Sequence, residues 1–355
     1  MITNNNFYDF IVIGGGPAGS IFTKELANNK KIKILLIDGQ NTKSSKVCGG
    51  LLSPDAQKIL LKLNLTLPTS VLDDPQIFDV MTIDLNKECN KFYQRHYLNM
   101  DRQKFDKWLL SLIPDNVTIC NGRCIKIENS NDVKKITIKI DNNELTVIGK
   151  YIIGADGSNS IVKKTFFKKN ISKYVAIQQY FINNNNYFPP YSCIFDSVTS
   201  PSCSWTIKKG NYLIYGGAFD KKNCHNQFEI QKKRFEKYIG YSLGTPIKTE
   251  SCFVTSPRKI TDFTFGNNNI FLIGEAAGFI SSSSFEGISY AMLSGKILAD
   301  CFIKYTNNNI LKKYKKKCLS MCLKLYCKIL KRKILFNQFL RFIIMKSGIK
   351  SIKKY

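Results

Sequence analysis

Acidic residues, histidines and long apolar runs are all scarce in this sequence, and each scarcity excludes something. Only His96 and His225 could offer an imidazole to a metal, and the twelve cysteines contain no CxxC pair, so we expect no structural metal site. No stretch reaches the roughly 18 consecutive apolar residues of a membrane-spanning helix. The N-terminus has neither a basic region nor a cleavage site typical of a secretory signal, which favours a cytoplasmic protein with reduced thiols.

The shortage of acidic residues leaves a strongly basic chain. Fifty-three Lys and Arg face 26 Asp and Glu, a formal net charge of +27. This charge fits a phosphorylated ligand, nucleic acid or acidic lipid, although a base-composition bias that enriches Lys and Asn explains it equally well. Nucleic acid is the least favoured of these partners, because no recognition motif or aromatic-studded sheet accompanies the charge.

What the sequence does have is the start of a nucleotide-binding unit. Its 355 residues, 44% of them hydrophobic, can bury a sizeable core. A strand is predicted at residues 8–13, and the motif G-x-G-x-x-G, formed by Gly14, Gly16 and Gly19, leads into a helix. Asp38 ends the next predicted strand, nineteen residues beyond Gly19. In such a unit the turn and the helix N-terminus hold a pyrophosphate, and the carboxylate binds an adenosine ribose of FAD or NAD.

The remaining pattern divides the chain into three parts. We predict an α/β fold: a Rossmann-like domain with a central parallel sheet, an inserted antiparallel β domain that binds substrate, and C-terminal helices. The predicted ranges are 1–72, 101–171 and 257–306 for the first domain, 73–100 and 172–256 for the second, and 307–355 for a basic helical region.

Several further motifs give the chain a family resemblance. GGGPAG, GADGSNS and GEAAG occur in an order and spacing similar to those of flavoprotein hydroxylases and geranylgeranyl reductases. CGGLLSPDAQ, DPQIF, YVAIQQ, YSCIFD and FLIGEAAGFISSSSFEGISYA resemble the CbrA family, a bacterial branch beside the geranylgeranyl reductases. The resemblance spans residues 8 to about 300 and implies an FAD-dependent oxidoreductase.

The resemblance also implies where FAD would be held. Asp38 would bind the adenosine ribose, and Arg102 would face the phosphate or ribityl chain, unless it is only a solvated helix charge. Asp156 and Gly157 would lie beside the cofactor, unless Asp156 merely makes an Asx-turn. Glu275 stands where relatives have Asp and would contact the ribityl hydroxyls. The expected cofactor-binding set is completed by Gly14, Gly16, Pro17, Ala18, Gly19, Gly274, Gly278, Gly287 and Ile288.

Two segments are expected near the flavin ring. Residues 281–288 lead into a helix whose free N–H groups would stabilise negative charge on the reduced ring; the alternative is a Ser-rich loop that only caps the helix. Cys48, in the CGG segment, would line the substrate side and assist protonation, although a buried Cys is more often a small hydrophobic residue. The flavin itself would carry the chemistry.

The favoured reaction is reduction of a carbon–carbon double bond, or the reverse dehydrogenation, in an apolar isoprenoid-like substrate. A flavin hydroxylase is the alternative, although the His and Pro usual in that branch are missing between Gly274 and Gly287. A non-catalytic FAD-binding regulator is the second alternative. With a single G-x-G-x-x-G, the electron donor would be NAD(P)H bound transiently or a small redox protein.

The last 49 residues contain fifteen Lys or Arg and no Asp or Glu. Their apolar residues recur at helical spacing in the set Leu311, Tyr314, Cys318, Met321, Cys322, Leu325 and Ile329, and the pattern continues with Phe336, Phe339, Leu340 and Ile343. Such a helix either lies on an anionic membrane surface, where a polyprenyl-type lipid could enter, or packs this stripe on the first domain. The oligomeric state is left open.

Overall fold

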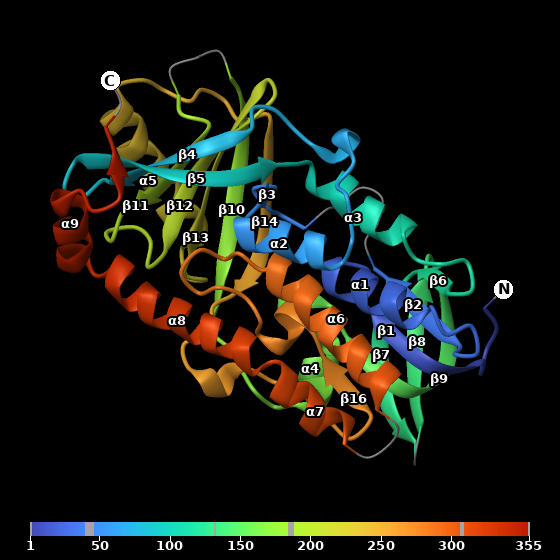
Figure 1. Cartoon of the computed structure of the whole chain (residues 1–355). Helices are drawn as coiled ribbons and strands as arrows, with labels where there is room; N and C mark the ends of the chain where they lie inside the picture. Colours follow the sequence, from blue (N-terminus) through green and yellow to red (C-terminus); the bar gives the residue numbers. More distant parts are fainter. Residues whose placement is uncertain (1, 40–45, 131–132, 184–187, 306–308, 354–355) are drawn as a thin grey trace.

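The computed structural model describes residues 2–39, 46–130, 133–183, 188–305 and 309–353. These residues form two sheets that lie side by side, with helices packed around and between them (Figure 1). The predicted fold class is confirmed, because one sheet has a parallel centre and the other is almost wholly antiparallel.

The first sheet is built on the parallel order β16-β9-β1-β2-β6. Its members are β1 (Phe7–Ile13), β2 (Ile34–Asp38), β6 (Thr118–Asn121), β9 (Asn143–Gly154) and β16 (Ile270–Leu272), with β15 (Gly266–Asn267) antiparallel at the edge. β7 (Arg123–Ser130) and β8 (Val133–Ile140) extend β9 as antiparallel strands. All five residues of β2 are buried, as expected for a central parallel strand with both faces covered.

Helices cover this sheet and connect its strands. α1 (Pro17–Leu26) packs against α6 (Ile288–Lys304), and α2 (Pro54–Lys62) and α3 (Arg102–Ser111) lie beside them (Figure 1). The shorter helices are α4 (Ile161–Phe166), η1 (Thr69–Val71), η2 (Gly157–Asn159), η3 (Ile260–Asp262) and η4 (Gly274–Ala277).

The second sheet has the order β14-β10-β13-β12-β11-β4-β5-β17. Its strands are β4 (Ile77–Asp84), β5 (Cys89–Asn99), β10 (Lys173–Ile182), β11 (Tyr191–Phe195), β12 (Cys203–Lys209), β13 (Tyr212–Phe219), β14 (Lys248–Thr255) and β17 (Ser351–Ile352); β3 (Leu51–Leu52) also pairs with β5. One pair departs from the antiparallel expectation: β4 and β11 run parallel. β4 and β11 are far apart in the sequence, so no hairpin turn connects them and makes them antiparallel.

One helix interrupts the segment that the sequence pattern assigned to strands. α5 (Cys224–Ile239) packs Phe228 and Phe235 against Tyr215 and Phe219 of β13. These two phenylalanines are seven residues apart, which places them on the same helix face.

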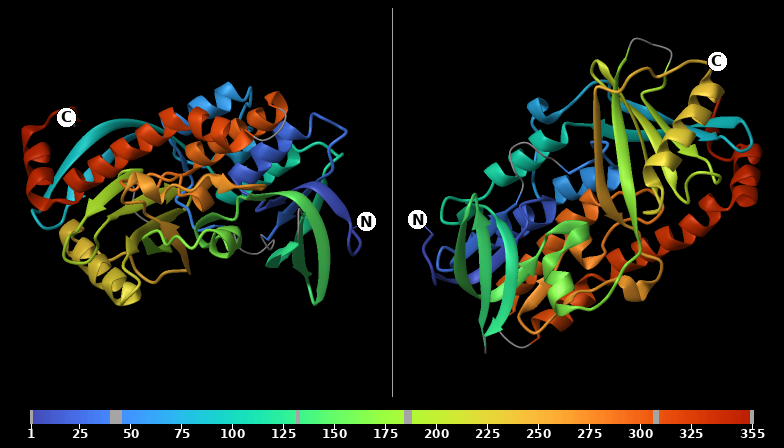
Figure 2. Two further views of the ribbon diagram at one scale, coloured as in Figure 1. Left: turned by 90° about the horizontal axis from the view of Figure 1, so that it is seen from below. Right: turned by 180° about the vertical axis from the view of Figure 1, so that it is seen from behind.

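The basic tail folds as α7 (Ile310–Lys317), α8 (Leu319–Phe336) and α9 (Gln338–Ser347). These helices run along the side of the molecule from the first sheet to the second (Figures 1 and 2). The apolar stripe considered for membrane contact is instead turned inward. Tyr314, Cys318, Met321, Cys322, Leu325 and Ile329 are buried in the core that contains β1 and β16.

For these six residues the structure therefore shows the other alternative, packing on the first domain. Its physical reason is a packing partner: the first sheet offers a complementary apolar face, and the Tyr314 hydroxyl donates to the Leu272 carbonyl at 3.1 Å. Among the described residues, none of the helices has the length and hydropathy to cross a membrane.

Candidate functional site

The glycine-rich turn lies between β1 and α1 and opens onto a large cavity. Gly14 has φ +111°, and a Cβ there would meet the Ala155 carbonyl oxygen at 2.5 Å. A Cβ on Gly16 would meet nothing within 4 Å, because Gly16 faces the cavity. In the part of the chain that the structure describes, no side chain caps α1 at Gly16. The first-turn N–H groups can therefore bind an anion.

The third glycine of the motif, Gly19, packs directly against the backbone of this turn. Gly19 does not line the cavity; a Cβ there would collide with the Gly14 carbonyl oxygen. Pro17 and Ala18, the two residues before it, do line the cavity. Gly14 and Gly19 thus shape the turn, whereas the backbone at Gly16 is exposed to a ligand in the cavity.

Asp38 lies at the end of β2, is 8% exposed and lines the cavity. A Cβ on Gly15 would lie 2.7 Å from the Asp38 Cγ, so a glycine at position 15 lets the carboxylate approach the turn. This arrangement is the one expected for a carboxylate that accepts hydrogen bonds from a ribose.

Asp156 and Gly157 follow β9 and also line the cavity. Asp156 Oδ2 accepts hydrogen bonds from Ile161 N at 2.6 Å and Val162 N at 3.4 Å, so this oxygen caps the start of α4. The Oδ1 atom is buried and has no partner among the described residues. Burial raises the pKa of Asp156, and the hydrogen bonds oppose this shift in part. An Asx-turn thus explains the contacts of Asp156 Oδ2, but it does not explain why Oδ1 is buried without a partner among the described residues.

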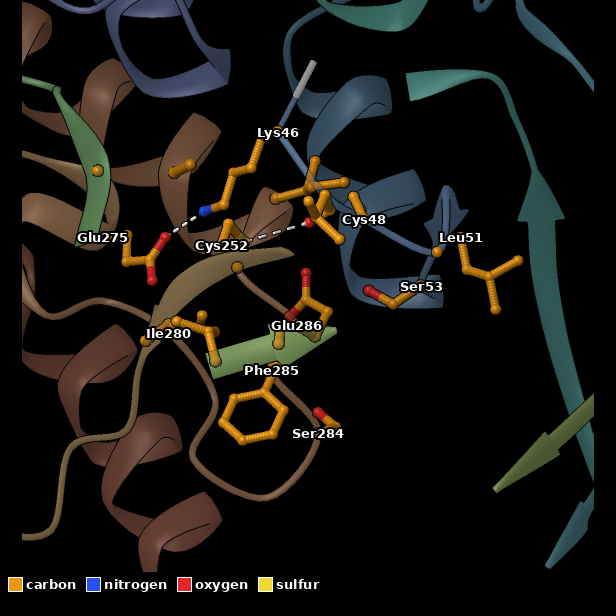
Figure 3. A pocket seen from close by; sticks show the side chains of 18 of the residues that line it. Lys46, Cys48, Leu51, Ser53, Cys252, Glu275, Ile280, Ser284, Phe285 and Glu286 are labelled. Atoms are coloured by element: carbon orange, nitrogen blue, oxygen red, sulfur yellow. Dashed lines mark hydrogen bonds and ion pairs between the residues drawn. The ribbon is translucent and has the colours of Figure 1, made fainter. Parts of the chain in front are cut away.

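Glu275 is in η4, next to the end of β14, and both its carboxylate oxygens have protein partners. Oε1 accepts from Thr255 N at 2.8 Å, and Oε2 forms an ion pair with Lys46 (Figure 3). Burial disfavours the Lys46 ammonium, but Glu275 outweighs this effect and the pKa of Lys46 is raised. The two neighbouring glycines, Gly274 and Gly278, do not line the cavity and instead turn the chain at φ +58° and +87°.

Arg102 begins α3 and reaches the cavity wall, so it is not a solvated helix charge. Its Nε donates to Asp106 Oδ1 at 2.9 Å, and the two side chains are 10% and 3% exposed. Burial opposes its positive charge, yet Asp106 and Cys48 outweigh burial and raise the pKa of Arg102. The sulfur of Cys48 also accepts from Gly50 N at 3.4 Å. Cys48 therefore faces the cavity within contact of a cation.

The segment before α6 brings a carboxylate to the expected helix start. Gly287 and Ile288 line the cavity, as does Glu286 (Figure 3). Glu286 accepts from the backbone N and the hydroxyl of Ser289, both at 2.9 Å. One N–H group at the expected helix start, that of Ser289, is therefore already bound by a carboxylate. Glu286 opens onto the cavity rather than bulk water, and this desolvation raises its pKa.

Apart from Gly19, Gly274 and Gly278, the expected site residues all line one cavity of about 1850 Å³. This exceeds the ~300–1,000 Å³ typical of a pocket for one small ligand. Away from the glycine turn its walls become apolar, with side chains from the second sheet and from the tail: Val80, Tyr97, Tyr191, Phe195, Trp205, Ile207, Leu330, Ile334, Leu335, Ile344 and Met345. The cavity thus joins a polar, glycine-lined half to an apolar half.

Sequence reasoning missed three contributors to this cavity. Lys46 and Glu286 directly flank the CGG segment and the start of α6, and their charge was the only signal available. The tail side chains had no local signal, because only the packing of α8 and α9 brings them to the cavity. Among the described residues, no cluster of three or more His, Cys, Asp or Glu could hold a metal ion.

Comparison with known proteins identifies close relatives in sequence. Protein CbrA of Escherichia coli O6:H1 is 40% identical over 351 residues, covering 97% of this chain and 94% of that protein. Protein CbrA of Shigella sonnei is also 40% identical, covering 97% of this chain and 98% of its own length. No family model matches the chain.

Solved structures with the same fold are much more distant in sequence. A geranylgeranyl bacteriochlorophyll reductase-like protein from Thermoplasma acidophilum superposes with a TM-score of 0.79 at 19% identity, covering 94% of this chain and 89% of that one. The flavin-dependent brominase Bmp2 gives a TM-score of 0.69 at 17% identity, with coverages of 96% and 93%. PqsL of Pseudomonas aeruginosa, a probable FAD-dependent monooxygenase, gives 0.70 at 11%, with coverages of 93% and 96%. The chain has the fold of FAD-dependent flavoproteins.

Proposed function

This chain belongs to the CbrA family, and we propose that it is an FAD-dependent oxidoreductase. We propose further that it reduces, or in the reverse direction dehydrogenates, a carbon–carbon double bond of an apolar isoprenoid-like substrate. The observation that carries the proposal is the single cavity that joins the glycine turn to an apolar chamber.

The polar half of the cavity fits FAD. Gly16 leaves open space before the uncapped start of α1, where a pyrophosphate would be held, and Asp38 lies at the edge of that space for a ribose. Lys46 and Arg102 add positive charge farther along the wall. When bound, FAD supplies hydride transfer, which no side chain of the protein can provide.

The apolar half of the cavity supports an apolar substrate. Aromatic side chains from β5, β11 and β12 form one wall, and aliphatic side chains from α8 and α9 form the other. Such walls exclude water and offer mainly contact area, which suits a hydrocarbon chain better than a polar metabolite. The protein's part is to position the double bond and keep the site dry.

Two groups on the wall can move a proton. Reduction of a double bond adds a hydride to one carbon and a proton to the other, so a donor must face the chamber. Glu286 is the stronger candidate, because its raised pKa favours the protonated carboxyl and it lines the cavity. Cys48, the residue favoured by the sequence, lines the cavity too but contacts Arg102.

The electron donor is proposed to be NAD(P)H, bound transiently, or a small redox protein. Hydroxylation is the second candidate reaction, since PqsL and p-nitrophenol 4-monooxygenase share the fold. A non-catalytic FAD-binding regulator is the third. We place the protein in the cytoplasm, where such donors are found.

Anaerobic turnover tests the proposal. The purified protein, supplied with FAD, is reduced with NADH, NADPH or dithionite and then mixed with polyprenyl lipids. We expect the flavin to be reoxidised without oxygen and one double bond of the lipid to become saturated, as measured by mass spectrometry. Reoxidation only by oxygen, with a hydroxylated product, would favour the monooxygenase. Reduction of bound FAD by dithionite but by no physiological donor, such as NADH or NADPH, would favour the regulator.

A further inference from the structure

The tail carries a second apolar stripe, distinct from the buried one. On α8 the exposed residues Leu319, Leu323, Tyr326, Leu330 and Ile334 recur every three or four positions and so share a face. Leu319 and Leu323 are 59% and 60% exposed. α9 adds Phe339, Leu340, Ile343 and Ile344, with Phe339 69% exposed. We call these nine residues the outer stripe.

An outer stripe of this size is unusual for a surface that faces only water. Single exposed apolar side chains are common, but nine of them on two consecutive helices form a continuous series that marks a contact surface. The stripe is also not needed for folding, because the opposite side of α8 already supplies Met321, Cys322, Leu325 and Ile329 to the core.

The charged residues of the tail itself are all of one sign. Residues 307–355 contain fifteen Lys or Arg and no acidic residue. The exposed lysines of the three helices include Lys315, Lys316, Lys317, Lys324 and Lys333. Within the described ranges, the structure pairs none of these five with a carboxylate. A partner with negative charge would therefore meet cations that are free to bind it.

The outer stripe is continuous with the mouth of the cavity. Leu330, Ile334 and Ile344 are exposed and at the same time line the cavity. Lys328 and Lys331 of α8 line it as well, together with Arg95 of β5. Desolvation lowers the pKa of Lys331, and the positive charges of Lys328 and Arg95 lie close enough to lower it further. The apolar interior and the apolar outer surface thus meet at a basic rim.

We propose that α8 and α9 dock on a lipid surface with anionic headgroups, with the outer stripe in the acyl boundary and the lysines at the headgroups. Apolar residues on one face and unpaired lysines beside them are the signature of an interfacial helix. A protein partner would need acidic groups placed against scattered lysines, whereas a lipid surface supplies negative charge everywhere. The docked orientation opens the cavity toward the membrane; that consequence alone rests on the proposed function.

Vesicle binding by the full chain tests the apolar part of this surface. The protein is sedimented with vesicles of phosphatidylglycerol and phosphatidylcholine, and with vesicles of phosphatidylcholine alone. Leu319→Gln/Leu323→Gln, both distant from the cavity lining, should weaken binding to the anionic vesicles at least about tenfold. Leu61→Gln, at a leucine of α2 that is even more exposed (75%), is the control and should bind like the wild type.

A second variant tests the lysines of this surface. Lys315→Gln/Lys316→Gln/Lys317→Gln should weaken binding to anionic vesicles by roughly fivefold per lysine at low salt, and added salt should remove the difference. The control removes the same charge elsewhere, at the exposed Lys30, Lys135 and Lys139. It should leave most of the affinity, because Lys135 and Lys139 lie on β8 and Lys30 lies before β2, all outside the tail helices.

Three results would overturn the proposal: no binding to anionic vesicles, binding equal for tail and control variants, or self-association through the outer stripe. Light scattering detects the last as a dimer that Leu319→Gln/Leu323→Gln dissociates. Vesicle sedimentation and light scattering do not depend on flavin turnover. An inactive protein that binds vesicles would therefore contradict the proposed reaction but not the docking surface. Deleting the tail would be uninformative, because α7 and α8 contribute to the core.

Discussion

At the scale of single residues, the glycines of the G-x-G-x-x-G motif differ in what they do. Gly16 borders open space, whereas Gly19 is in tight contact with the backbone of Gly14. The motif could be predicted from the sequence, together with Asp38, because both depend on local spacing. The ion-pair partner of Glu275 could not, since Lys46 is 229 residues from Glu275 and no local pattern links them.

This difference predicts opposite outcomes for two alanine variants. Gly16→Ala should leave the melting temperature of the FAD-free protein unchanged and weaken FAD binding about tenfold or more, because its methyl group enters the cavity. Gly19→Ala should lose about 1–3 kcal/mol of stability even without FAD, because Gly14 must move. Calorimetry and FAD titration measure both effects. Loss of stability in Gly16→Ala would show that the position is structural.

Glu286 gives a prediction about pH. Its pKa is raised in the folded state, so its stabilising contribution is complete below its unfolded pKa and is lost as pH rises through the folded pKa. Gln at this position does not titrate. The melting temperature of the wild type relative to Glu286→Gln should therefore fall between about pH 4 and pH 8. A difference that stays constant over this range, or rises, would mean that the carboxyl is not desolvated.

At the scale of elements, the predicted strands of both sheets are present, because their apolar runs carry a clear signal. α5 was missed because strand-like runs surround it, although Phe228 and Phe235 share a helix face. β17 has two residues, too few for any pattern, and it forms only because α9 brings the chain end to β5. Tertiary packing, rather than a local sequence pattern, therefore determines that α5 and β17 form.

A buried ion pair links α9 to the second sheet. Arg341 Nε donates to Asp84 Oδ2 at 2.8 Å, with side chains 3% and 0% exposed. Arg341→Met leaves the carboxylate buried alone and should cost about 3–5 kcal/mol in urea unfolding. Arg341→Met/Asp84→Asn should recover part of this loss. If the single variant unfolds like the wild type, α9 is held by other contacts.

At the scale of the whole molecule, the tail connects the two sheets and completes the cavity. The sequence predicted three parts of the chain, but the cavity requires all three: the glycine turn, the second sheet, and α8 with α9. The outer stripe and the inner stripe of α8 could not be told apart from periodicity, because apolar residues occur on two faces and only the fold shows which one is covered.

Titration of the purified protein with FAD tests the central claim most directly. We expect it to carry, or take up, one FAD per chain with the yellow absorption of an oxidised flavin, and Gly16→Ala to bind it more weakly. A folded wild-type chain that stays colourless at saturating FAD would contradict the account, because the polar half of the cavity would then hold something else.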